Sequence, residues 1–391
     1  MRCLRLLSII FAAAILSACS SISPSYEGKI PTIRVAILTD VPSAQFKMRG
    51  SYQILDPKSG QILEEGRLLD FVPISVNSQG FEVGQRHFAV DRLRLNPSKD
   101  VSLWTGDKER RYRGVIDLIK TGDGMFTAVN ILSIEDYVRG VLYHEVSHRW
   151  PIEAIKAQAV ATRTYAFYRK KMAKDREFDV TNDVYSQVYG GRTSEKYRTN
   201  IAVNQTFGQI LIFNGEILPA YFHACCGGHT EDASELWKHQ EMYPLKGKVC
   251  VYCAKSPYYH WEKNYQLSQI QEKLNANGYN LWLIKDIKIL ERTASGRAKT
   301  LEITTRDGKA VQISGKDFRD IIGPNEVRNL KFDIKMKGYF MDLVGQGWGH
   351  GVGMCQWGAR EMAEQHYDYQ QILNYYYSGS QLVDYRKSAR F

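Results

Sequence analysis

Short apolar runs separated by polar turns fill the first part of the chain. Ile33–Leu38 and Ser51–Leu55 have the residue types of β-strands. Two further runs, Tyr112–Ile119 and Met125–Ile131, flank Gly122-Asp123-Gly124, which is typical of a β-hairpin. We therefore expect a β-rich region before the first helix.

Helical periodicity begins after these strands. Ser133 and Asp136 form a capping box for a short helix that ends near Tyr143. A second helix is expected to begin at Trp150-Pro151, since proline suits the first helical position, and to run to about Lys174. Its predicted buried stripe contains Ile152, Ile155, Ala159 and Ala166.

The second half of the chain mixes both patterns. Residues 209–213 and 217–221 read as a hairpin that turns at Asn214-Gly215. Residues 266–342 combine a helix-like segment, Leu267–Asn277, with short strands, and we interpret them as an inserted α/β subdomain. The segment Ala359–Tyr377 is predicted to be helical.

These patterns predict an α+β fold with a β-rich N-terminal region and an inserted α/β subdomain. The predicted organisation is a leader (1–18), a polar tether (19–30), the β-rich region (31–110), the first part of a core (111–265), the inserted subdomain (266–342) and the C-terminal part of the core (343–391).

The leader predicts export. Arg2 and Arg5 precede an apolar run from Leu6 to Leu16, which is too short to span a membrane and is typical of a secretory signal. The run closes on Leu16-Ser17-Ala18-Cys19, which resembles the lipobox of bacterial lipoproteins. We expect cleavage before Cys19, lipidation of that cysteine and anchoring in a membrane on its outer side. A plain secreted protein is the alternative.

Charge points to the same compartment. Removal of residues 1–18 takes away two arginines and lowers the formal net charge from +10 to +8. For an exported protein, acidic wall polymers and anionic lipid head groups are the expected partners of a basic surface, and nucleic acid is not. The chain is also rich in aromatic residues, at 12%. Some of these could stack on sugar rings, although most are expected in the core.

The densest candidate site surrounds Glu145, which lies between His144 and His148 and just before the second helix. Lys156 and Arg163 are seven residues apart, so they share one face of that helix about 10.5 Å apart along its axis. They could support Glu145, or the three residues could form a structural set of ion pairs. His144-Glu145-Val146-Ser147-His148 also has the spacing of a zinc metalloprotease motif, but that motif should lie inside a helix.

Four ordered motifs resemble the stage II sporulation protein D and amidase-enhancer family. They are Asp136–Ala166, containing Glu145 and Lys-Ala-Gln-Ala-Val-Ala-Thr-Arg-Thr-Tyr-Ala; Asp179–Gly190, with Gln187-Val188-Tyr189; Ala220–Trp237, with Gly227-Gly228-His229-Thr230-Glu231; and Gly347–Ala359. The resemblance spans about residues 112–377.

This resemblance implies a lytic transglycosylase of peptidoglycan, with Glu145 as the catalytic acid and Lys156 and Arg163 as supporting cations. Such an enzyme cleaves between N-acetylmuramic acid and N-acetylglucosamine, leaves a 1,6-anhydro end and needs no cofactor. One carboxyl group is sufficient, whereas ordinary glycosidases generally use two. Glu153 could supply a second, but its place in the first helical turn is explained by the helix dipole. The family also contains non-catalytic enhancers of a cell-wall amidase, which is the alternative function.

The glycine-rich segment 345–353 does not fit a dinucleotide fingerprint. Its glycines would allow close approach of the backbone to a saccharide or to a neighbouring segment. Ordinary core packing is the alternative for the aromatic residues here. The expected substrate-binding residues are Tyr221, His223, Trp348, His350, Gln356 and Trp357.

Cysteines suggest a separate structural site. Cys250 and Cys253 have the spacing of a zinc knuckle, which Cys226 and a histidine could complete, with His229 as our choice. Disulfides and free thiols are the alternatives, since the chain is expected in an oxidising compartment. Some family members carry a metal site where a His-Cys pair precedes the Gln-Val-Tyr motif. This chain has Tyr185-Ser186 there, so that site is expected to be absent.

Overall fold

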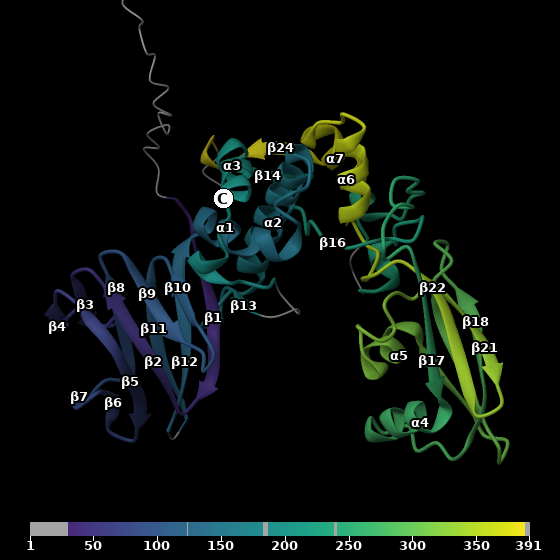
Figure 1. The fold of residues 1–391 in the computed structure, drawn as a ribbon, viewed down its shortest axis with the longest axis horizontal. Helices are drawn as coiled ribbons and strands as arrows, with labels where there is room; N and C mark the ends of the chain where they lie inside the picture. The colour runs from purple at the N-terminus through teal and green to yellow at the C-terminus, as the bar shows by residue number, and fades with distance from the viewer. Residues whose placement is uncertain (1–29, 123, 183–186, 238–240, 388–391) are drawn as a thin grey trace, which may run out of the picture.

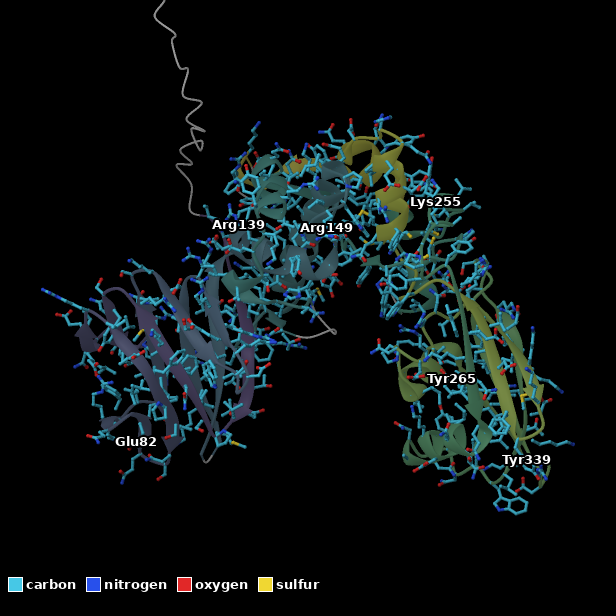
Figure 2. The ribbon with its side chains drawn as sticks, in the orientation of Figure 1. Glu82, Arg139, Arg149, Lys255, Tyr265 and Tyr339 are labelled. Atoms are coloured by element: carbon cyan, nitrogen blue, oxygen red, sulfur yellow. The ribbon has the colours of Figure 1, made fainter. Side chains whose placement is uncertain are left out.

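The computed structural model describes residues 30–122, 124–182, 187–237 and 241–387. Cys19 and Tyr185-Ser186 lie outside these ranges. The molecule has two lobes that hang from a helical layer, and Glu82 and Tyr339 mark the far ends of the two lobes (Figures 1 and 2). The predicted α+β class is confirmed.

The first lobe is a sandwich of two β-sheets. One sheet has the strand order β13-β1-β12-β11-β8-β3-β4, and the other has the order β10-β9-β2-β5-β6-β7. Both sheets contribute to one apolar core, which includes Phe46, Phe81 and Phe126. The strands are β1 (Thr32–Val41), β2 (Ser43–Arg49), β3 (Tyr52–Leu55), β4 (Ile62–Gly66), β5 (Leu69–Asn77), β6 (Gly80–Val83), β7 (Arg86–Phe88), β8 (Arg92–Pro97), β9 (Asp100–Trp104), β10 (Glu109–Tyr112), β11 (Val115–Gly122), β12 (Met125–Ser133) and β13 (Val180–Thr181).

The predicted hairpin around Gly122 is present as β11 and β12, which pair antiparallel. Strand β12 also pairs with β1, so the sandwich extends to Ser133 and continues directly into the first helix. The β-rich unit is therefore longer than the region 31–110.

The helical layer is built around α2 (Ile152–Met172). Ser133 caps α1 (Ile134–Glu145) by accepting a hydrogen bond from the Asp136 backbone, as predicted. Pro151 is the N-cap of α2 and not its first residue. The alanines of α2 allow close packing, because their small side chains let α1 and α6 approach the helix axis.

The remaining elements of this layer are α3 (Tyr197–Gln205), β14 (Gln209–Phe213), β15 (Glu216–Ile217), β16 (Phe222–His223), β23 (Met354–Cys355), α6 (Gln356–Glu364), α7 (Tyr369–Tyr376), β24 (Gln381–Asp384) and the short 3-10 turns η1 (Gly191–Ser194), η2 (Ala233–Glu235), η3 (Tyr243–Leu245) and η4 (Tyr385–Lys387). Strand β15 is shorter than predicted. The expected single C-terminal helix is two helices, because the chain turns at His366, whose φ is 68°.

The second lobe has its own core, which includes Trp261, Leu301 and Phe318. Its elements are β17 (His260–Gln266), α4 (Leu267–Ala276), β18 (Ile284–Arg292), β19 (Ala298–Thr305), β20 (Ala310–Ser314), α5 (Gly315–Ile322), β21 (Phe332–Lys337) and β22 (Phe340–Gln346). The lobe begins at β17 and returns through β22 to the glycine-rich segment, so both ends of the lobe adjoin the helical layer (Figure 1).

No helix within the described ranges is both long enough and apolar enough to cross a membrane.

Candidate active site

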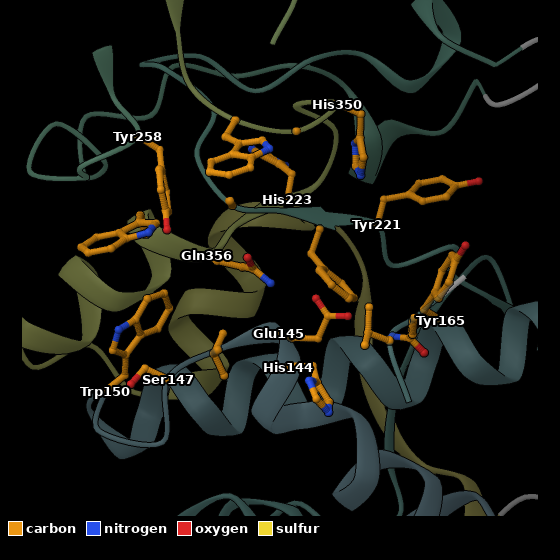
Figure 3. A pocket seen from close by; sticks show the side chains of 18 of the residues that line it. His144, Glu145, Ser147, Trp150, Tyr165, Tyr221, His223, Tyr258, His350 and Gln356 are labelled. Carbon is orange, nitrogen blue, oxygen red and sulfur yellow. The ribbon is translucent and has the colours of Figure 1, made fainter. Parts of the chain in front are cut away.

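A cavity of about 730 Å³ opens between the end of α1 and the start of α6. Its walls come from segments far apart in the sequence: residues 143–147, strand β16, the segment 348–350 and the first residues of α6 (Figure 3). Cavities of this size are typical of ligand sites. All six residues that we predicted for a substrate groove line it together with Glu145.

Glu145 is the last residue of α1, and its carboxylate points into the cavity (Figure 3). It is partly exposed, yet protein surrounds the carboxyl group on most sides. This burial raises the pKa of Glu145 to about 7, and a hydrogen bond from Gln356 offsets part of the rise. The negative end of the α1 dipole acts in the same direction as burial. The carboxyl group is therefore partly protonated at neutral pH.

Gln356, the first residue of α6, holds the carboxylate from above (Figure 3). Its amide also donates to the side-chain oxygen of Gln158 on α2, at 3.4 Å. Gln158 in turn donates to Thr162 at 3.2 Å. A primary amide has two donor hydrogens, so Gln356 can serve Gln158 and Glu145 together. This chain of amides fixes the carboxylate relative to both helices.

Aromatic rings cover the wall opposite α1. Tyr221 stacks on Trp237 with ring centroids 4.4 Å apart, and His350 packs edge-on against Trp237. On the other side of Gln356, Trp357 lies 5.4 Å from Trp150 between ring centroids. These flat, partly exposed faces suit the apolar faces of sugar rings.

Two histidines of this wall are neutral. Burial lowers the pKa of His350 to about 3 and that of His223 well below its usual value. His223 donates from Nδ1 to the Val352 carbonyl at 3.0 Å, and His350 accepts from the Val352 backbone at Nδ1. Both rings are thus oriented by one backbone segment, and neither adds positive charge to the cavity.

Comparison with known proteins shows which family has a similar sequence. Residues 122–213 match a family model described as stage II sporulation protein, and residues 246–353 match a domain of unknown function, DUF8618. The chain is 30% identical over 274 residues to stage II sporulation protein D of Bacillus subtilis, covering 66% of this chain and 76% of that protein. The chain belongs to the stage II sporulation protein D family.

Two further relatives support this membership. An uncharacterized protein of Brachyspira hyodysenteriae is 39% identical over 277 residues, covering 71% of this chain and 73% of that protein. The amidase enhancer of Bacillus subtilis is 27% identical over 295 residues, covering 63% of this chain but only 40% of that protein. The predicted resemblance is confirmed.

Lys156 and Arg163, the cations that we expected to support Glu145, do not contact it. Arg163 is fully buried and makes two charge-assisted hydrogen bonds to Glu135, at 2.8 and 2.9 Å. Lys156 pairs with Glu153 at 2.6 Å. Neither cation lines the cavity. The structure thus does not bring Lys156 and Arg163 together with Glu145, since each forms an ion pair with another carboxylate.

The metalloprotease alternative does not fit the geometry either. Helix α1 ends at Glu145, so His148 lies outside it, and the two histidines do not share a helix face. His144 points away from the cavity centre and bonds to Ser194 at 2.7 Å (Figure 3). Within the described ranges, only cysteines come together as a candidate metal-ligand group.

That group differs from the predicted ligand set in its fourth member. The sulfur atoms of Cys226, Cys250, Cys253 and Cys355 lie within 4.8 Å of one another. His229 is outside the group, and its Nδ1 faces the Thr230 carbonyl at 2.6 Å. Cys355 takes the place that we assigned to His229.

Several cavity residues were missed by the sequence analysis. Tyr165 and Tyr258 line the cavity, and Trp237 forms the stacked pair with Tyr221. Gln158, which orients Gln356, lies below the lining. The only sequence signal for these residues is that Gln158, Tyr165 and Trp237 fall inside the family motifs, whereas Tyr258 does not.

Proposed function

We propose that this protein is a lytic transglycosylase that cleaves peptidoglycan glycan strands, with Glu145 as its general acid and base. Membership of the family links the chain to the cell wall. The observation that carries the finer proposal is the setting of Glu145. It is the only carboxylate among the described residues that line the cavity, and its pKa is raised to about 7. A single carboxyl group with such a pKa can give up a proton and take one back at neutral pH.

The proposed reaction needs one carboxyl group and no water. Protonated Glu145 donates its proton to the glycosidic oxygen as the bond from that oxygen to C1 of N-acetylmuramic acid breaks. The C6 hydroxyl of the same sugar attacks C1, and its proton passes to the Glu145 carboxylate. The products are an N-acetylglucosamine end with a free hydroxyl and a 1,6-anhydro ring, and Glu145 ends protonated.

Gln356 supports both halves of this cycle. Its hydrogen bond stabilises the carboxylate that forms after the first proton transfer. The bond to Gln158 holds its amide in place, so little reorganisation is needed. We therefore assign Gln356 as a positioning residue.

The aromatic wall supplies a binding surface for sugar rings. Tyr221 with Trp237 lies on one side of Glu145, and Trp150 with Trp357 lies on the other. A strand running between them would pass its glycosidic bond over the carboxyl group. The resemblance suggests strands stripped of stem peptides as substrate. Lipid anchoring at Cys19 on the outer side of a membrane would keep the cavity beside the wall.

A second candidate is a non-catalytic, glycan-binding enhancer of a cell-wall amidase. The relative named amidase enhancer favours it. So does the absence of any lysine or arginine among the described lining residues, since a catalytic carboxylate is often assisted by a cation. If the protein is such an enhancer, the aromatic wall would bind glycan and Glu145 would have no catalytic role.

Purified protein incubated with peptide-free glycan strands separates the two functions. The enzyme should generate anhydromuramyl ends, detected by mass spectrometry, and Glu145→Gln should lose at least 100-fold in rate, roughly the usual contribution of general acid–base catalysis. Glu153→Gln is the matched control, because Glu153 bonds to Lys156 and to the Tyr369 backbone outside the cavity. Absence of anhydro product from wild type, or undiminished product from Glu145→Gln, would overturn the enzymatic proposal.

A further inference from the structure

Four cysteines from three separate segments of the chain meet at the start of α6. Cys226 follows β16, Cys250 and Cys253 lie in the connection to the second lobe, and Cys355 ends β23. All four are buried, and their sulfur atoms lie within 4.8 Å of one another. The sulfurs of Cys226 and Cys253 are 3.4 Å apart. This separation exceeds a disulfide bond length of about 2.05 Å.

These separations match a tetrahedral metal site. A zinc–thiolate bond is about 2.3 Å, so the sulfurs of a regular four-cysteine site lie roughly 3.8 Å apart. The observed sulfurs, all within 4.8 Å of one another, are close enough to share one ion at this spacing. Four thiolates in tetrahedral array are typical of zinc.

The surroundings also suit thiolates. The Cys226 backbone N–H points at the Cys355 sulfur at 3.3 Å, and the Tyr376 hydroxyl lies 3.3 Å from the Cys250 sulfur. Cys355 is the N-cap of α6, where the positive end of the helix dipole favours an anion.

Two nearby cations offset part of the charge of such a site. Four thiolates around a divalent ion carry a net charge of −2, which is costly to bury alone. The fully buried Arg297 interacts electrostatically with Glu231 first and then with Cys226 and Cys355, and it donates to the Cys226 carbonyl at 2.8 Å. Lys331 donates to the Gly227 carbonyl at 2.7 Å. Both hydrogen bonds hold the backbone around Cys226. Hydrogen bonds made by residues outside the ligand set help to orient metal ligands.

We propose that Cys226, Cys250, Cys253 and Cys355 bind one zinc ion that holds the cavity walls together. Cys355 directly precedes Gln356, the hydrogen-bond partner of Glu145. Strands β16 and β23 pair so that His223 lies opposite Cys355. The ion would also join these strands to the connection that carries Cys253. In that connection Lys255 pairs with Glu361 of α6. Zinc is structural here and takes no part in the chemistry proposed for Glu145.

Metal analysis of the full exported chain, purified under reducing conditions without added metal, tests the site. Wild type should contain about one zinc per chain, and Cys355→Ser should lose most of it. Cys225→Ser is the matched control, because Cys225 is equally buried and adjoins Cys226 but lies outside the group of four. It should retain zinc.

Cobalt substitution of wild type covers the case in which Cys355→Ser does not fold. The cobalt protein should show the charge-transfer and ligand-field bands of a tetrahedral tetrathiolate. Iron in place of zinc, disulfide-linked cysteines by mass spectrometry, or equal metal in wild type and Cys355→Ser would each overturn the proposal. No glycan is present in these measurements, so their outcome is independent of whether the protein cleaves strands.

Discussion

The unusual pKa of Glu145 should appear as a pH-dependent difference in stability between wild type and Glu145→Gln. The pKa is raised from 4.5 to about 7 in the folded protein. A carboxyl group with a raised pKa binds its proton more tightly when folded. Its contribution is therefore fully present below the unfolded pKa and is lost as pH rises through about 7.

The size of the effect follows from the shift. A rise of roughly 2.5 units at about 1.4 kcal/mol per unit gives an upper value of about 3 kcal/mol. Because Glu145 is partly exposed, solvent screening lowers this to about 1–3 kcal/mol. Glutamine keeps the shape of the side chain but does not ionise. The variant should thus become more stable than wild type, by about that amount, above neutral pH, while at about pH 5 the two should be nearly equal.

Urea unfolding followed by tryptophan fluorescence at about pH 5 and about pH 8 measures this difference, since all other titrating groups are shared by the two proteins. A difference that stays constant with pH, or a wild type that gains stability over the variant as pH rises, would refute the idea that Glu145 is a buried, easily protonated carboxyl group.

Two further predictions concern the cations and the rate. Arg163→Met should destabilise the protein by about 3–5 kcal/mol, because it leaves Glu135 buried without its cation. Lys156→Met, which removes a more exposed ion pair, should cost only about 0–1 kcal/mol. Thermal unfolding measures both losses, and losses of similar size would contradict the assignment of Arg163 to a buried ion pair. For glycan cleavage, kcat/KM should fall as pH rises through about 7, since the acid form of Glu145 is lost. A rate that rises over this range would argue against Glu145 as the acid.

Local sequence signals predicted the helices around the site well. Ser133 caps α1 as its spacing to Asp136 indicated, because a capping box depends only on neighbouring residues. The family motifs also predicted which residues would line the cavity, since segments that build one surface are shared as a set. Glu145, His350 and Gln356 meet there although more than 200 residues separate Glu145 from the other two.

Partners across the fold could not be predicted in this way. The spacing of Lys156 and Arg163 places them on one helix face, but their separation along the axis lets each meet a different carboxylate. In the same way, the zinc-knuckle spacing identified Cys250 and Cys253, whereas Cys355 joins them only through the pairing of β16 with β23. A parallel pair of two-residue strands leaves almost no pattern in the sequence.

Isotope labelling can show whether one carboxyl group cleaves the glycan without water. Wild-type protein would digest peptide-free glycan strands in water enriched in the heavy oxygen isotope, and the new ends would be analysed by mass spectrometry. Intramolecular attack by the C6 hydroxyl predicts anhydromuramyl ends that carry no label, formed by wild type and not by Glu145→Gln. Labelled reducing ends would show that water attacks instead, and would contradict the account of Glu145 as the acid and base of a lytic transglycosylase.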